Sequence, residues 1–237
     1  MEEGLLRKRL KNWLIGLGID PDNLKIYVES MTHRSFAREI NIKSRGNEQL
    51  EFLGDSILSF IITSYLYKNF SFLSEGRLAK IRSLLVSGKT LAHIARNLKL
   101  DRQILLSENE EGSEGRSKES ILADTFEAFI GAIYLDRGIN FVSQWFLDKF
   151  EDIIEEKASS PKISDYKTYL QEAVQADYGK LVKYSIEDFE GPDHDRIFHS
   201  SAKIDNKVVG RGSGKSKKES EQEAAKEALR SLYNLTV

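Results

Sequence analysis

The chain has 237 residues, enough for one large domain or two smaller ones, and its 40% hydrophobic and 30% charged residues exclude wholesale disorder. The lack of cysteine excludes disulfides and thiolate metal sites, and a net charge of −2 argues against nucleic acid as a ligand of the chain taken as a whole. The longest apolar run, 57–67, is too short to cross a bilayer and no secretory signal is visible, so we expect a cytoplasmic protein without a membrane partner.

Helical periodicity dominates the first two thirds of the chain. Apolar residues recur every three or four positions in 78–85, 91–98, 121–135 and 141–154. Loops are expected at 44–46, at 74–76 and across the polar run 107–117. We therefore expect an all-α domain over residues 1–157.

The pattern changes after a short charged stretch that contains a proline, and we expect residues 158–164 to be a linker. Residues 165–178 have the periodicity of an amphipathic helix, and 217–233 are rich in helix-forming residues. Between them, 183–189, 197–204 and 207–212 alternate as strands, with turns at 191–194 and 205–206. Residues 165–237 are thus predicted to form a small α+β domain of order α-β-β-β-α.

Acidic residues are placed at regular intervals in two apolar segments of the helical part. Glu48, Glu51 and Asp55 stand at i, i+3 and i+7, and Asp124 and Glu127 at i and i+3, so each group shares one helix face. Antiparallel packing of the two helices would bring four of these acids together, and such oxygen ligands suit Mg²⁺ or Mn²⁺ better than zinc. The alternative for either group alone is a solvated helix face.

A basic segment near the end of the chain is a second candidate site. Residues 203–218 contain six basic residues against one acid. Glycines near position 212 would let the backbone approach a phosphate, and the N-terminus of the last predicted helix would offer free N–H groups. A capped surface helix, with Ser216 as N-cap and Glu219 completing a capping box, is compatible with the same residues.

Three stretches in the helical part resemble motifs of the ribonuclease III family. Residues 47–56, Asn-Glu-Gln-Leu-Glu-Phe-Leu-Gly-Asp-Ser, are similar to the hallmark motif of that family, and 32–37 and 118–128 match two further motifs in the same order. The C-terminal part resembles the double-stranded RNA-binding domain. Together the resemblance spans essentially the whole chain and implies an RNase III-like helical nuclease domain followed by a duplex-RNA-binding domain.

The resemblance also implies roles for single residues. The positions that match the metal-binding acids of the family are Glu51, Asp55, Asp124 and Glu127, of which Asp55 and Glu127 are expected to be catalytic and Glu127 to bridge metals. Glu48 and Glu75 match outer acids that assist with the scissile phosphate and a second metal, although Glu75 alone is explained by the helix dipole. Phe52 matches an aromatic that enters the partner subunit of a homodimer, where an ordinary core aromatic is the alternative. Gln49 departs from the Arg or Lys common in relatives.

In the C-terminal part, the resemblance implies that the first helix and the 191–194 turn enter successive minor grooves while lysines hold the phosphates between them. The corresponding positions are Thr168, Gln171, Glu172, Gln175, His194, Lys215, Lys217 and Lys218. His194 alone is compatible with an ordinary exposed turn residue.

The resulting hypothesis is a homodimeric, Mg²⁺-dependent endoribonuclease, without a small-molecule cofactor, that cuts double-stranded RNA to leave 5′-phosphate and 3′-hydroxyl ends during processing of ribosomal RNA precursors and messages. One rival is a duplex-binding regulator that no longer cuts, which would require a lost acid, whereas all four inner acids are present. The other is a DNA-directed metal nuclease, which the resemblance to an A-form-binding module disfavours.

Overall fold

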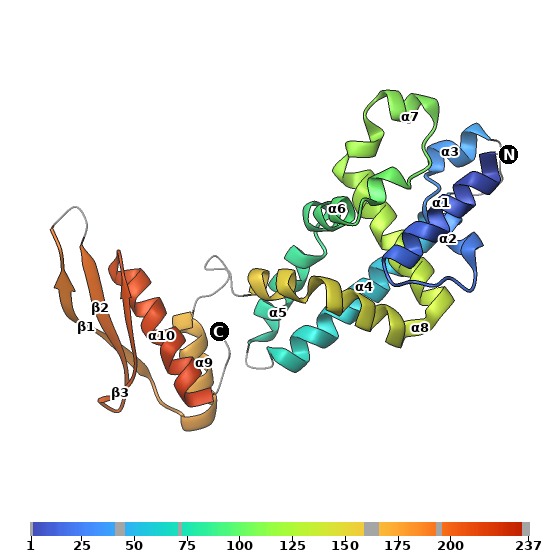
Figure 1. The fold of residues 1–237 in the computed structure, drawn as a ribbon. Helices are drawn as coiled ribbons and strands as arrows, with labels where there is room; N and C mark the ends of the chain where they lie inside the picture. Colours follow the sequence, from blue (N-terminus) through green and yellow to red (C-terminus); the bar gives the residue numbers. More distant parts are fainter. Residues whose placement is uncertain (1, 41–45, 71–72, 159–165, 193–195, 234–237) are drawn as a thin grey trace. The chain divides into compact units, whose positions relative to one another are not determined.

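The computed structural model describes residues 2–40, 46–70, 73–158, 166–192 and 196–233 (Figure 1). The chain divides into two compact units, Met1–Asn69 with Ala79–Ile154 and Phe70–Leu78 with Glu155–Val237. The predicted boundary at residue 157 and the predicted linker 158–164 fall on a segment of which residues 159–164 lie outside the described part. Those boundaries therefore stay a prediction.

The first unit is helical, as predicted. The α-helices up to residue 158 are α1 (Glu2–Gly16), α2 (Leu24–Ser30), α3 (Arg34–Glu39), α4 (Glu48–Asn69), α5 (Glu75–Leu85), α6 (Gly88–Asn97), α7 (Glu108–Gly112) and α8 (Glu119–Ala158). Two short 3₁₀ turns, η1 (Leu100–Arg102) and η2 (Gly115–Ser117), connect them. The start of α5, up to Leu78, and the end of α8, from Glu155, are counted with the second unit. An isolated bridge joins Thr32 to Leu105. Among the described residues, no helix combines the length and apolar character that crossing a bilayer requires.

Helix α8 joins two helices that the sequence predicted separately. The backbone leaves helical geometry at Gly138, where φ is +79°, a conformation that favours glycine over residues with a Cβ. On either side of this kink the helix carries large aromatic side chains into the core. Phe129 packs edge-on against Trp145 with ring centroids 5.7 Å apart, and Phe126 and Phe146 are fully buried.

Helices α4 and α8 cross with their backbones in close contact at two glycines. A Cβ on Gly54 would lie 1.7 Å from the carbonyl oxygen of Glu127, and one on Gly131 would lie 2.4 Å from that of Leu50. Residue 50 therefore faces residue 131 and residue 54 faces residue 127, so the two helices run antiparallel, as predicted. Any side chain larger than hydrogen at either glycine would force the two helices apart.

The polar run 107–117 is not the loop that its composition predicted. It forms α7 and η2, because Ser107 caps α7 by accepting a hydrogen bond from the N–H of Glu110 at 3.2 Å. Arg116 then holds the segment in place by donating to the carbonyl of Ile104 at 2.9 Å and to the carboxylate of Glu111. The predicted loop is wrong because a local cap and an ion pair order these polar residues.

The second unit has the predicted order α9 (Tyr166–Tyr178), β1 (Val182–Glu190), β2 (Ile197–Ile204), β3 (Lys207–Gly214) and α10 (Lys217–Tyr233). The strands form an antiparallel sheet in the order β1-β2-β3, and both helices lie on one face of it (Figure 1). Asp205 and Asn206 both have positive φ, as a two-residue hairpin turn requires. The core of this unit includes Leu170, Val174 and Leu229.

Candidate metal centre

Three carboxylates from two helices converge in the first unit. One oxygen from each of Glu51 on α4 and Asp124 and Glu127 on α8 lies within 4.8 Å of the others, and all three residues are half-buried. Ligand oxygens around Mg²⁺ lie up to about 4.2 Å apart, so small side-chain rotations would let one ion contact all three. The convergence depends on the glycine crossing, because Gly54 faces the backbone of Glu127 itself.

Asp55 and Glu48 lie at the edge of this cluster. Asp55 is exposed and is not one of the three acids whose oxygens converge, but its charge helps to raise the pKa of both Glu127 and Glu51. Glu48 forms an ion pair with Arg34, with 3.5 Å between Oε1 and a guanidinium nitrogen. The helix face predicted for Glu48, Glu51 and Asp55 therefore spans an inner position and two outer ones.

The electrostatics of the cluster favour binding of a cation. Burial, followed by the charges of Asp55, Asp124 and Glu51, raises the pKa of Glu127 to about 8. Burial also raises the pKa of Glu51 and of Asp124, and in both cases the nearby Arg34 opposes the shift. When no cation is bound, Glu127 is therefore largely protonated at neutral pH. A bound cation would replace that proton.

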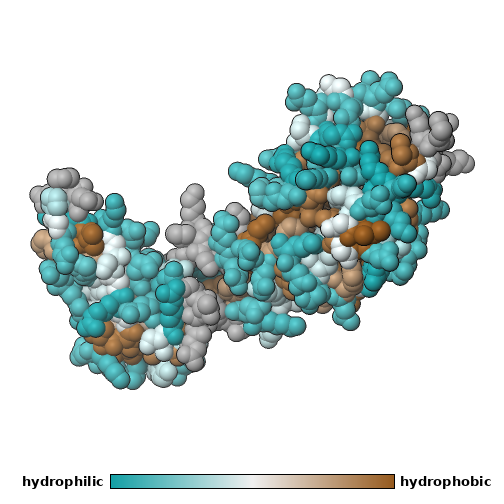
Figure 2. All heavy atoms as spheres, viewed as in Figure 1, coloured by the Kyte–Doolittle hydropathy of each residue, from teal (hydrophilic) through white to brown (hydrophobic). Residues whose placement is uncertain are grey.

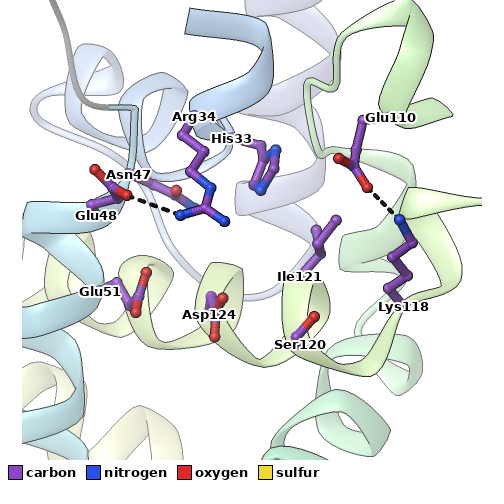
Figure 3. A pocket seen from close by; sticks show the side chains of 10 residues that line it. All are labelled: His33, Arg34, Asn47, Glu48, Glu51, Glu110, Lys118, Ser120, Ile121 and Asp124. Atoms are coloured by element: carbon purple, nitrogen blue, oxygen red, sulfur yellow. Dashed lines mark hydrogen bonds and ion pairs between the residues drawn. The ribbon is translucent and has the colours of Figure 1, made fainter. Parts of the chain in front are cut away.

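A pocket of about 480 Å³ opens beside Glu51 and Asp124 (Figure 3). Figure 3 shows the guanidinium of Arg34 reaching in toward Glu48 while Lys118 pairs with Glu110 at 2.6 Å. The lining residues that sequence reasoning did not single out are His33, Arg34, Asn47, Glu110, Lys118, Ser120 and Ile121. Most of them lie inside the motifs at 32–37, 47–56 and 118–128, and these motifs were the sequence feature that could have identified them. Glu110 lies in the segment that was expected to be a loop, where no motif pointed to it.

The donor set fits a hard divalent ion. Every atom that converges is a carboxylate oxygen, and the chain has no cysteine to offer a softer ligand. Such an arrangement suits Mg²⁺ or Mn²⁺, which prefer oxygen ligands. The cluster is thus able to hold a divalent cation beside a solvent-open pocket that Glu51 and Asp124 line.

Phe52 is on the outer face of α4 and is 79% exposed, which excludes the alternative of an ordinary core aromatic. Phe60 and Tyr67, at 58% and 70% exposure, lie within the same helix face by their spacing. Figure 2 shows that apolar side chains gather in limited areas of a mostly hydrophilic surface. Glu75 is exposed in the first turn of α5, in the segment that belongs to the second unit, so its proposed link to the acids stays a prediction.

The residues predicted to bind RNA through α9 are in different environments. Thr168, Glu172 and Gln175 are exposed, whereas Gln171 is half-buried. The amide of Gln171 donates to the carbonyl of Lys180 at 3.1 Å and accepts from the N–H of Val182 at 2.9 Å. Its amide therefore connects α9 to the start of β1, and contact with RNA would compete with these bonds. His194 lies outside the described residues.

Lys215, Lys217 and Lys218 are exposed around the N-terminus of α10. Ser216 caps this helix, accepting from the N–H of Glu219 at 3.2 Å, as predicted. The carboxylate of Glu219, however, accepts from the N–H of Lys215 at 2.8 Å. The capping box had predicted that this carboxylate would accept from the N–H of Ser216, so the donor is one residue earlier than expected.

The glycines of β3 have a different role from the one the sequence predicted. A Cβ on Gly212 would lie 2.1 Å from the backbone nitrogen of Ala224, and one on Gly210 would lie 2.3 Å from the carbonyl oxygen of the same residue. They therefore allow α10 to pack closely on the sheet. The lack of a Cβ at these two positions is therefore explained by α10, and the approach of the 212–214 backbone to a phosphate stays a prediction.

Comparison with known proteins gives matches over both units. A family model described as ribonuclease-III-like matches residues 23–153, and one described as a double-stranded RNA binding motif matches residues 166–232. A protein named ribonuclease 3 from Borreliella burgdorferi is 41% identical over 98% of this chain and 94% of its own length. A ribonuclease 3 from Clostridium beijerinckii is 44% identical over 94% of this chain and 96% of its own length.

Two solved structures of ribonuclease III nuclease domains are also similar to this chain. The nuclease domain of ribonuclease III from Campylobacter jejuni is similar with a TM-score of 0.56 and 37% identity, covering 65% of this chain and 98% of that domain. A second structure of that domain, described for structural flexibility in a region involved in dimer formation, has a TM-score of 0.55 and 36% identity over 63% of this chain and 98% of that one.

Proposed function

The chain belongs to the ribonuclease III family, and from that premise we propose that it cleaves double-stranded RNA by divalent-metal-dependent hydrolysis, leaving 5′-phosphate and 3′-hydroxyl ends. The observation that carries the proposal is the convergence of Glu51, Asp124 and Glu127 on one point beside an open pocket. Mg²⁺ is the proposed ion, and Mn²⁺ is expected to substitute for it.

Each acid has a separate task in this proposal. Glu51, Asp124 and Glu127 supply the oxygen ligands, and Glu127 gives up its proton when the ion binds, because its raised pKa keeps it protonated beforehand. A bound ion would supply an acidified water and charge neutralisation at the phosphate. Asp55, exposed at the edge of the cluster, is proposed as the fourth metal-binding acid and as a catalytic acid, and Glu48 and Glu75 are proposed to act as outer acids.

Duplex RNA is the proposed substrate because the second unit matches a double-stranded RNA binding motif. Exposed Lys215, Lys217 and Lys218 lie where a helix N-terminus adds its own positive end, an arrangement that suits phosphate. Thr168, Gln171, Glu172, Gln175 and His194 remain proposed RNA contacts. Ribosomal RNA precursors and structured messages in the cytoplasm are the proposed natural substrates.

A homodimer is the proposed assembly. Phe52, Phe60 and Tyr67 expose large apolar side chains on one face of α4, and such a surface is typical of an interface. The similar nuclease domain from Campylobacter jejuni has been described for flexibility in a region involved in dimer formation. Two subunits would then contribute one cutting centre each, so that each strand of the duplex is cut once.

Replacement of Glu127 by Gln tests this function. We expect Glu127→Gln to abolish cleavage of a long RNA duplex in Mg²⁺ while duplex binding stays within about twofold, because the RNA-binding lysines are unchanged. Asp152→Asn, which removes an exposed acid from the same helix, is the matched control and should cut normally. Cleavage by Glu127→Gln at the wild-type rate would contradict the role of this residue, and wild-type cleavage that persists in EDTA would contradict metal dependence.

The cleavage assay and a competition experiment distinguish the two rival functions. A regulator that binds without cutting would leave the duplex intact in Mg²⁺, which the complete set of converging acids argues against. A DNA-directed nuclease would be revealed by duplex DNA that competes as strongly as duplex RNA.

A further inference from the structure

We propose that Arg34 binds a backbone phosphate of the RNA strand that enters the acidic pocket, and so fixes that strand beside the metal ligands. The inference rests on the proposed function and concerns the motif at 32–37, to which the acid cluster itself assigns no role. Arg34 lines the pocket on the side of α3, while Glu51 and Asp124 line it from α4 and α8 (Figure 3).

The backbone of Arg34 is held firmly at the rim of the pocket. His33 caps α3 by accepting from the N–H of Ser35 at 3.3 Å. Gly46, with φ of +70°, lies so close that a Cβ on it would be 2.7 Å from the nitrogen of Arg34. Asn47 is buried and donates to the carbonyl of Ser30 at 3.2 Å. These contacts join the start of α3 to the start of α4, so the base of the Arg34 side chain is preorganised.

The guanidinium of Arg34, by contrast, is weakly committed to its protein partner. Its ion pair with Glu48 has one contact of 3.5 Å, and the two side chains are 58% and 41% exposed. An exposed pair of this kind contributes little to stability, so exchanging Glu48 for another anion costs little. A guanidinium also carries a planar fork of N–H donors that matches the oxygens of a phosphate.

The other cation in the pocket is committed elsewhere. Lys118 is 2.6 Å from Glu110 and 3.1 Å from the hydroxyl of Ser113, and this pairing lowers the pKa of Glu110. Among the described residues that line the pocket, Arg34 is therefore the cation best able to accept a new anion.

A phosphate-binding cation solves an electrostatic problem of this site. The residues around the pocket and the cluster are rich in carboxylates, which would repel an RNA strand. A bound metal ion would offset the charge only where Glu51, Asp124 and Glu127 converge. A fixed positive charge on the α3 side attracts the neighbouring phosphate and leaves the acids free for the ion.

The test is the salt dependence of duplex binding by the full chain. A labelled RNA duplex is titrated in Ca²⁺ at several salt concentrations, with gels to verify that the RNA is intact. Arg34→Gln should weaken binding about fivefold to tenfold and lower the slope of log affinity against log salt by about one, as for the loss of one phosphate contact. Arg38→Gln, which removes an exposed charge from the same helix but outside the pocket lining, is the matched control and should bind within about twofold of wild type. Arg34→Lys should keep the slope.

A second measurement separates phosphate binding from support of the acids. Mn²⁺ affinity without RNA, measured by calorimetry, should be unchanged or tighter in Arg34→Gln, because a like charge is removed. A severalfold loss of Mn²⁺ affinity, or duplex binding equal to that of Arg38→Gln, would overturn the inference. If Glu127→Gln is inactive while Arg34→Gln matches its control, this inference alone fails; if Glu127→Gln still cuts, the proposed function fails first.

Discussion

The raised pKa of Glu127 makes a prediction about stability that is independent of RNA. In the unfolded chain this carboxyl ionises near its ordinary value of 4.5, whereas in the folded protein its pKa is about 8. Between these values the folded state binds more protons than the unfolded state, so rising pH favours unfolding. Without metal, the acid therefore costs stability that Glu127→Gln, which cannot ionise, should recover.

The size of the effect follows from the shift. At ~1.4 kcal/mol per pKa unit, a change from 4.5 to about 8 sets an upper limit of about 5 kcal/mol at pH 8. Glu127 is only half-buried, and water that reaches the carboxyl screens part of this cost. We therefore expect Glu127→Gln to be more stable than wild type by roughly 2 kcal/mol at pH 8 in EDTA, with little difference at pH 5.

Urea unfolding at equal protein concentration measures this difference at pH 5, 6, 7 and 8. The Asp152→Asn control should show no trend of this kind. Saturating Mn²⁺ should reverse the order at pH 8, because an ion bound by the folded wild type stabilises it by mass action. A difference between Glu127→Gln and wild type that stays constant from pH 5 to pH 8 in EDTA would refute the electrostatic reasoning.

Four further outcomes are expected. Mn²⁺ binding near pH 7 should release about one proton from Glu127, seen as calorimetric heats that differ between buffers of different ionisation enthalpy; equal heats would contradict this. Gly54→Ala should cost about 3 kcal/mol or more in urea unfolding because its Cβ meets the backbone of α8, whereas Gly76→Ala, with nothing within 4 Å, should be neutral or slightly stabilising. Phe52→Asp should give a monomer in sedimentation with an unchanged circular dichroism spectrum, and a persistent dimer would remove Phe52 from the interface. Lys215→Ala should weaken binding of all duplexes alike and flatten the salt dependence by about one unit; a loss selective for sequence would contradict a phosphate contact.

Most of the fold was predictable because it depends on local patterns. The alternation of residues predicted β2, and a composition rich in helix-forming residues predicted α10, both with the bounds that the structure has. The Asp205-Asn206 pair predicted its turn. The run 107–117 was predicted wrongly as a loop, because composition alone does not reveal the cap at Ser107 and the ion pair of Arg116 that order it.

The sequence predicted the roles of the site residues less completely than the fold, because several of these roles depend on contacts with residues far away in the sequence. Gln171 shares the periodicity of its exposed neighbours on α9, yet its amide bonds to the start of β1. Gly212 was interpreted as an approach to phosphate, yet it accommodates α10. Phe52 was compatible with core or surface until its exposure was known.

By itself, the sequence determined which acids share a helix face, because the helical period alone decides it, and its motifs indicated the family. Only the tertiary structure decided that Glu51, Asp124 and Glu127 form the inner cluster while Asp55 stands at its edge. It also decided that Arg34 faces these acids from a third helix. The physical reason is that the positions of these residues depend on how closely α4 and α8 approach each other. That distance is set by the contact of the two backbones at Gly54 and Gly131, and no local sequence pattern encodes it.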